Sequence, residues 1–113
     1  MSQSTVIALF PQVVYNGTNT TVTGDKYPAA GYYLGKNELQ TISWKFSVAA
    51  VVIKIQATLE QSPEDDDWFT VHTVVGTGID EIGYENISGN FVWIRAVINN
   101  FASGSVQFVR LTY

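Results

Sequence analysis

Residues Val51–Val75 read VVIKIQATLEQSPEDDDWFTVHTVV, and this stretch decides the fold. In its first arm, apolar and polar side chains alternate from Ile53 to Glu60, which is the period of a strand with one buried face. The second arm, Trp68–Val75, alternates in the same way. Between the arms, Gln61–Asp67 holds a proline and four consecutive acids, which neither a sheet core nor a helix interior accepts. The stretch therefore predicts a long antiparallel hairpin around which the other strands pack.

Further strand patterns lie on both sides of this hairpin. Glu38–Val48 alternates cleanly, Asn90–Phe101 is apolar on both faces, and Ser105–Tyr113 reads as a final strand. Thr5–Tyr15 is broken by Pro11, which cannot donate to a ladder, so we expect either an edge strand or a strand that bends between two sheets. Recurring strands with turn signals between them predict an all-β antiparallel sandwich, jelly-roll-like, with residues 1–113 as a single domain. The expected core is Trp44, Phe46, Ile53, Ile55, Phe69, Val71, Val92, Ile94 and Val109.

Three stretches carry turn residues and are predicted to connect the strands. Lys26–Lys36 mixes tyrosines with Pro, Ala and Gly and reads as a loop, in which Gly31–Leu34 could form a short strand. Residues 76–90 are rich in Gly and acids, so we expect at most a short strand at Ile79–Tyr84. Asn99–Gly104 is predicted to be a turn.

Composition limits the possible functions. The 113 residues carry six Lys and Arg against ten Asp and Glu, a net charge of −4. The basic residues form no cluster, so no nucleic-acid partner is expected. There is no cysteine, which removes disulfides and thiolate metal sites. The N-terminal residues lack a basic segment and no apolar run approaches ~20 residues, so we expect neither a signal peptide nor a membrane span.

The ionisable residues give no pattern of a catalytic site. His72 is the single histidine, lies in a predicted strand, and has no nucleophile motif to serve. The acids of Glu64–Asp67 are contiguous and lack the spacing of a calcium loop, so they read as a solvated hairpin tip. A second acidic group, Asp80, Glu81 and Glu85, could approach them in space. We expect no enzyme, no catalytic residues, no metal and no cofactor.

The strand Asn90–Phe101 has two apolar faces, whereas each sheet of a two-layer sandwich has one interior. Either loops or a second subunit must cover the other face, and we expect a homo-oligomer. Aromatic side chains commonly anchor such interfaces because they offer a large area at low entropic cost. The candidate interface residues are Tyr27, Tyr32, Tyr33, Phe91, Trp93 and Val97. The alternative for the tyrosines is that they cover one end of the core.

The second half of the chain also carries a family resemblance. Its segments DWFTV, NISGNFVWIRAV and GSVQFVRLTY resemble strands of jelly-roll sandwich modules of the discoidin and galactose-binding type. They are still more similar to short structural proteins of tailed bacteriophages, including those of T4-like cyanophages. The phage resemblance implies a non-enzymatic virion protein, made in the host cytoplasm, that assembles with itself or with capsid, neck or tail proteins. The other resemblance implies a small carbohydrate-binding module, which we keep as the alternative.

Overall fold

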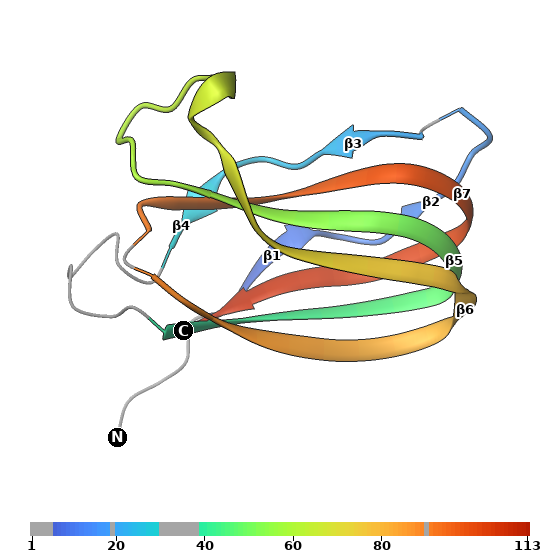
Figure 1. Cartoon of the computed structure of the whole chain (residues 1–113). Coiled ribbons are helices and arrows are strands. Elements are labelled where there is room, and N and C mark those ends of the chain that lie inside the picture. Colours follow the sequence, from blue (N-terminus) through green and yellow to red (C-terminus); the bar gives the residue numbers. More distant parts are fainter. Residues whose placement is uncertain (1–5, 19, 30–38, 90) are drawn as a thin grey trace.

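The computed structural model describes residues 6–18, 20–29, 39–89 and 91–113. All regular structure in these residues is strand, apart from one turn of 3-10 helix (Figure 1). The elements are β1 (Val6–Phe10), β2 (Val13–Val14), β3 (Val22–Thr23), β4 (Tyr27–Pro28), β5 (Leu39–Thr58), η1 (Asp65–Asp67), β6 (Phe69–Ser88) and β7 (Trp93–Thr112). The predicted all-β class is therefore confirmed.

The three long strands form an antiparallel sheet that folds over on itself. The strand order is β1-β7-β5-β6, and each of β5, β6 and β7 has 20 residues. Figure 1 shows all three bending at the same end of the molecule and running back. The ladder of β5 shifts register between Phe46 and Ala49, and residues of positive φ, among them Val48, Gly78 and Asn100, lie at the bends. Each long strand thereby contributes one half to each of two layers.

The pairing defines these layers. Residues 39–47 of β5 pair with 81–88 of β6 and with 105–112 of β7, whereas residues 50–58 pair with 69–77 of β6 and with residues of β7 between 93 and 103. The shortest extent of the molecule is 17 Å, which fits two sheets packed about 10 Å apart. The fold is an antiparallel β-sandwich made from one bent sheet.

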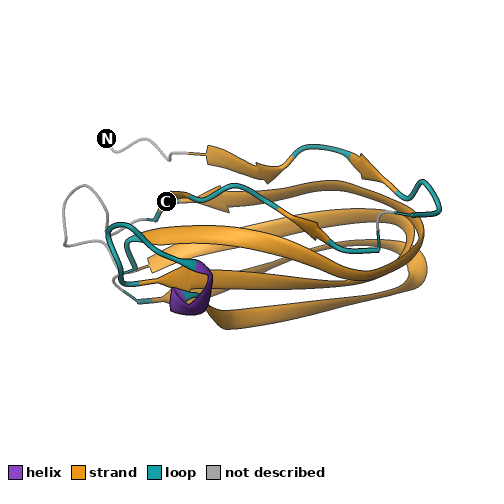
Figure 2. Cartoon of the chain, turned by 90° about the horizontal axis from the view of Figure 1, so that it is seen from above, coloured by secondary structure: helices purple, strands orange, loops and turns teal. Residues whose placement is uncertain are grey.

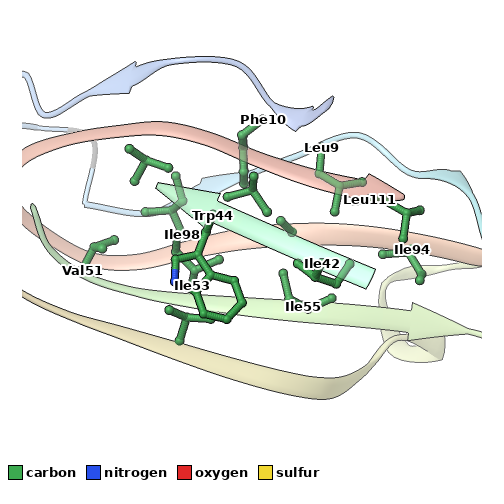
Figure 3. Packing of buried hydrophobic residues seen from close by; sticks show 14 of the residues in the cluster. Leu9, Phe10, Ile42, Trp44, Val51, Ile53, Ile55, Ile94, Ile98 and Leu111 are labelled. Atoms are coloured by element: carbon green, nitrogen blue, oxygen red, sulfur yellow. The ribbon is translucent and has the colours of Figure 1, made fainter. Parts of the chain in front are cut away.

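The core lies between the two layers and is filled by the inward positions of β5 and β7 (Figure 3). On β5, Ile42 and Phe46 point inward from one layer and Ile53 and Ile55 from the other, all at most 1% exposed. The remaining labelled core residues in Figure 3 are Leu9, Phe10, Trp44, Val51, Ile94, Ile98 and Leu111. Because each of these four β5 residues alternates with a more exposed one, the period-2 pattern accounts for which side chains of β5 are buried.

The hairpin prediction is confirmed, but two predicted connections are wrong. Residues 76–88 are not a loop, since β6 continues without interruption to Ser88. Asn99–Gly104 is not a turn, because β7 runs through it. The turn-forming residues of both stretches serve instead as bends inside long strands, where Gly78 has φ 90° and Gly104 has φ 73°.

The predicted core is confirmed in most positions. Trp44, Phe46, Ile53, Ile55, Ile94 and Val109 are buried. Val71 and Val92 are only half-buried, and Phe69 is wrong, with 42% of its surface exposed. Phe69 is the first residue of the edge strand β6 and pairs with the buried Ala57, so its position at the end of the sheet leaves its ring exposed.

Candidate interaction surfaces

The first candidate site is the free edge of strand β6. Within the described residues, β6 pairs with β5 alone, so its other side carries unpaired backbone groups (Figure 1). Four exposed apolar side chains lie along it, and we call them the β6 patch. They are Val75, Ile79, Ile82 and Tyr84, exposed by 58%, 62%, 70% and 68%. A long, apolar, unpaired edge is the part of a sheet most able to add another strand.

The inward side of this edge carries acids where core side chains would be expected. Glu81, Gly83 and Glu85 pair with Phe46, Trp44 and Ile42, which all point into the core. Both glutamates are exposed, because the edge position lets their carboxylates reach solvent. Inward-pointing charges on an edge strand disfavour pairing with an arbitrary strand. The β6 edge is therefore open only to a partner that accommodates these acids.

Trp44 packs directly beneath the same edge. A Cβ atom on Gly83 would lie 2.8 Å from Cζ2 of the indole, so glycine leaves the space that this ring occupies. The ring stacks on His72, with centroids 5.7 Å apart and an interplanar angle of 29°. Trp44 is 9% exposed, and its buried Nε1 has no hydrogen-bond partner among the described residues. Trp44 of β5 and His72 of β6 thus pack against each other behind this edge.

The opposite edge of the sheet differs from β6. It consists of β1, β2, β3 and β4, which all pair with β7 and are at most five residues long. Pro11 separates β1 from β2, and Pro28 lies within β4. Short strands interrupted by proline are poor templates for strand addition. The edge strand predicted at Pro11 is thus confirmed, and β6 is the longer and more regular of the two edges.

The second candidate site is a hollow at the end of the molecule opposite the bends. It has a volume of about 320 Å³ and is lined by Gly24, Asp25, Lys26, Pro63, Asp65, Trp68 and Arg95. The hairpin tip that carries η1 folds against this end (Figure 2). There the guanidinium of Arg95 lies over the Trp68 ring, 4.3 Å from its centroid, and Arg95 Nε donates to Gln56 Oε1 at 2.8 Å. Two cations, two carboxylates and an indole can together bind a polar ligand.

The electrostatics of this hollow centre on Arg95. Partial burial lowers the pKa of its guanidinium, and the charge of Asp65 opposes that effect. Next to it, the Nζ atom of Lys26 lies 5.0 Å from the centroid of the Trp93 ring. Both cations are therefore already held on aromatic faces, and a ligand would have to compete with these contacts.

The interface residues predicted from sequence occupy several places. Trp93 is half-buried and its Nε1 donates to the backbone oxygen of Gln61 at 2.9 Å, while Val97 is 8% exposed. Phe91 meets Phe69 edge-on, with centroids 5.9 Å apart. Tyr27 packs against the core cluster, and Tyr32 and Tyr33 lie outside the described residues. The hairpin tip reaches Trp93 through Gln61, and Lys26 lies on the Trp93 ring, which the sequence pattern did not indicate.

The β6 patch was not predicted, although the sequence carries a signal for it. Ile82 and Tyr84 alternate with Glu81, Gly83 and Glu85, the period of a strand. The glycines and acids made this segment read as a loop. In the structure the same alternation places the apolar side chains outward and the acids inward.

The two acidic groups do not meet. Glu64–Asp67 lie at the hairpin tip, where Glu64 N donates to Asp67 Oδ2 at 2.8 Å. Asp80 lies at the bends, and its Oδ1 accepts a hydrogen bond from Val48 N at 3.0 Å. In the described part of the chain, no group of three His, Cys, Asp or Glu side chains is arranged to hold a metal ion. The described residues form no helix long and apolar enough to cross a membrane.

Comparison with known proteins adds no assignment. No protein-family model matches the sequence, and no curated protein matches it at a significant level.

Proposed function

We propose that this protein is a non-enzymatic structural protein that acts by assembling with other protein subunits through the edge of β6. The observation that supports this is the β6 patch, in which four large apolar side chains are exposed along a 20-residue unpaired edge. Exposing such a row to water is unfavourable, and a partner strand that covers it gains both apolar burial and backbone hydrogen bonds. The low number of charged side chains fits a surface that becomes covered.

The setting that we propose is the virion of a tailed bacteriophage, as the sequence resemblance suggests. The protein would be made in the host cytoplasm and bind itself and capsid, neck or tail proteins. Mass spectrometry of purified particles tests this setting. Peptides of this chain should be present in amounts comparable to those of known structural subunits. Their absence from particles, when the chain is abundant in infected cells, would contradict a virion role.

The hollow at the end of the molecule opposite the bends favours a second candidate, a small carbohydrate-binding module. Trp68 supplies an aromatic face, and Asp25, Asp65 and Arg95 supply groups that hydrogen-bond hydroxyls. A glycan array would then show micromolar binding that Trp68→Ala removes. Binding that persists in this variant but is lost in Tyr32→Ala or Tyr33→Ala would place the glycan site on the tyrosine segment instead. If no glycan binds, the carbohydrate-binding candidate is removed and the assembly role remains.

A further inference from the structure

We infer that the β6 edge binds the β6 edge of a second copy of this chain, so that two sandwiches join side by side about a two-fold axis. This inference rests on the proposed function and names the partner of the same site. Its basis is the distribution of apolar and charged side chains along β6, which suits antiparallel pairing with itself.

The register that pairs the whole strand also places two residues of the β6 patch opposite each other. Two antiparallel copies of β6 overlap over all 20 residues when Phe69 of one copy lies opposite Ser88 of the other. Val75 then lies opposite Ile82 of the second copy. Both side chains are outward and more than half exposed, and they alternate with residues whose β5 partners point into the core. Cross-strand apolar pairs of this kind are the stabilising unit of a sheet, and the symmetry produces this pair twice.

The same register separates the acids from one another. Glu85 lies opposite His72 of the second copy, and both positions are inward, since their β5 partners are Ile42 and Ile55. Glu81 lies opposite Gly76, which carries no charge. No carboxylate of β6 then faces a carboxylate directly. The charges that disfavour an arbitrary partner are thus accommodated by a second copy, and they select it.

The bend of the sheet is compatible with this pairing. In the full-length register Gly78, which has φ 90° at the bend, lies opposite Ile79 of the second copy. The bends of the two copies therefore coincide, and each layer of one sandwich continues into a layer of the other. Because the opposite edge is short and interrupted by proline, the pairing closes as a dimer and does not propagate as a fibre.

Disulfide cross-linking tests the pair and its register, because the chain has no cysteine of its own. The variant Val75→Cys/Ile82→Cys places thiols opposite each other at both symmetry-related positions. The matched controls are the two single variants. In the proposed register, the two Val75 residues lie in opposite layers, as do the two Ile82 residues, and packed layers are about 10 Å apart. A disulfide needs Cα atoms within about 7 Å of each other, so neither single variant can form one across this pairing.

Under mild oxidation, the double variant should form a covalent dimer at least tenfold more completely than either single variant, and reduction should reverse it. Both positions are exposed, so the substitutions should leave the fold intact, which circular dichroism checks. Equal cross-linking of double and single variants, or none in any of them, would overturn the inference. If the chain is present in virus particles but monomeric in solution, self-pairing of β6 is overturned. The proposed structural role is then kept, with another protein bound to the β6 edge. A dimer with this register that is absent from particles would instead remove the virion role.

Discussion

Replacing Trp44 by phenylalanine tests the packing beneath the β6 edge, because that packing predicts whether the free energy of unfolding rises or falls. The indole is 9% exposed and stacks on His72, yet its buried Nε1 has no hydrogen-bond partner among the described residues. A phenyl ring keeps the stack and removes the unsatisfied donor. The variant Trp44→Phe therefore separates the contribution of the ring from that of the N–H group.

The expected magnitude follows from two opposing effects. An unsatisfied buried donor costs about 1–3 kcal/mol, which the substitution recovers. The smaller ring leaves a cavity, and at about 24 cal/mol per Å³ a void of about 40 Å³ costs about 1 kcal/mol. The free energy of unfolding should therefore stay unchanged or rise by up to about 2 kcal/mol. The control Trp44→Ala, which removes the ring, should lower it by about 3–5 kcal/mol.

Urea unfolding at neutral pH, followed by far-ultraviolet circular dichroism, measures both variants without relying on the fluorescence of the altered residue. A loss of more than about 2 kcal/mol in Trp44→Phe would refute the reasoning, because it would mean that Nε1 makes a stabilising hydrogen bond. A small loss in Trp44→Ala would show that the ring is not part of the core.

Three further predictions concern the core and the hairpin tip. Ile55→Ala and Ile94→Ala, both at fully buried positions, should each lower the free energy of unfolding by about 2–5 kcal/mol in urea titrations; losses under about 1 kcal/mol at both would contradict the inward assignment. Arg95→Ala removes the contact with the Trp68 ring and a side-chain hydrogen bond, so a loss of about 1–2 kcal/mol is expected, and an unchanged melting temperature would show that the tip is held by other contacts. Because we expect no metal at the tip, millimolar calcium should not raise the melting temperature of the wild type, and changing the aspartates at 65–67 to asparagine should leave this result unchanged. A ligand at 100 times its Kd stabilises a protein by about 2.7 kcal/mol. A calcium-dependent rise in the melting temperature that disappears in the asparagine variant would therefore refute the expectation.

The strands with one buried face could be predicted from the sequence because their side chains alternate. On β5, Ile53 and Ile55 alternate with Lys54 and Gln56, and the structure buries the first pair completely. Such a pattern depends only on the side-chain period of a strand, which tertiary packing does not change.

The bends could not be predicted, because glycine and asparagine serve both turns and bent strands. Gly78, Asn100 and Gly104 all have positive φ, which a tight turn also requires. Whether the chain reverses or bends at such residues depends on the neighbouring strand. Here β5 bends at Val48 beside both of its neighbours, and the three strands bend together.

The candidate site depends on position in the sheet, which a sequence pattern does not contain. Ile82 and Tyr84 form an exposed patch because β6 is the last strand of the sheet; in a central strand the same side chains would face neighbours on both sides. Conversely, Trp93 and Val97 looked available for an interface. The structure brings Gln61 and Lys26 to Trp93 from distant parts of the chain.

Light scattering across micromolar to hundreds-of-micromolar concentrations tests association through the β6 edge most directly. The wild-type protein should show twice the 12.5 kDa mass of the chain. Val75→Glu/Ile82→Glu should be monomeric at concentrations where the wild type is dimeric. Leu59→Glu, which changes an equally exposed apolar residue at 63% exposure outside β6, should behave as the wild type. A wild-type monomer over the whole range, or a dimer that the β6 variant retains, would contradict self-association through this edge.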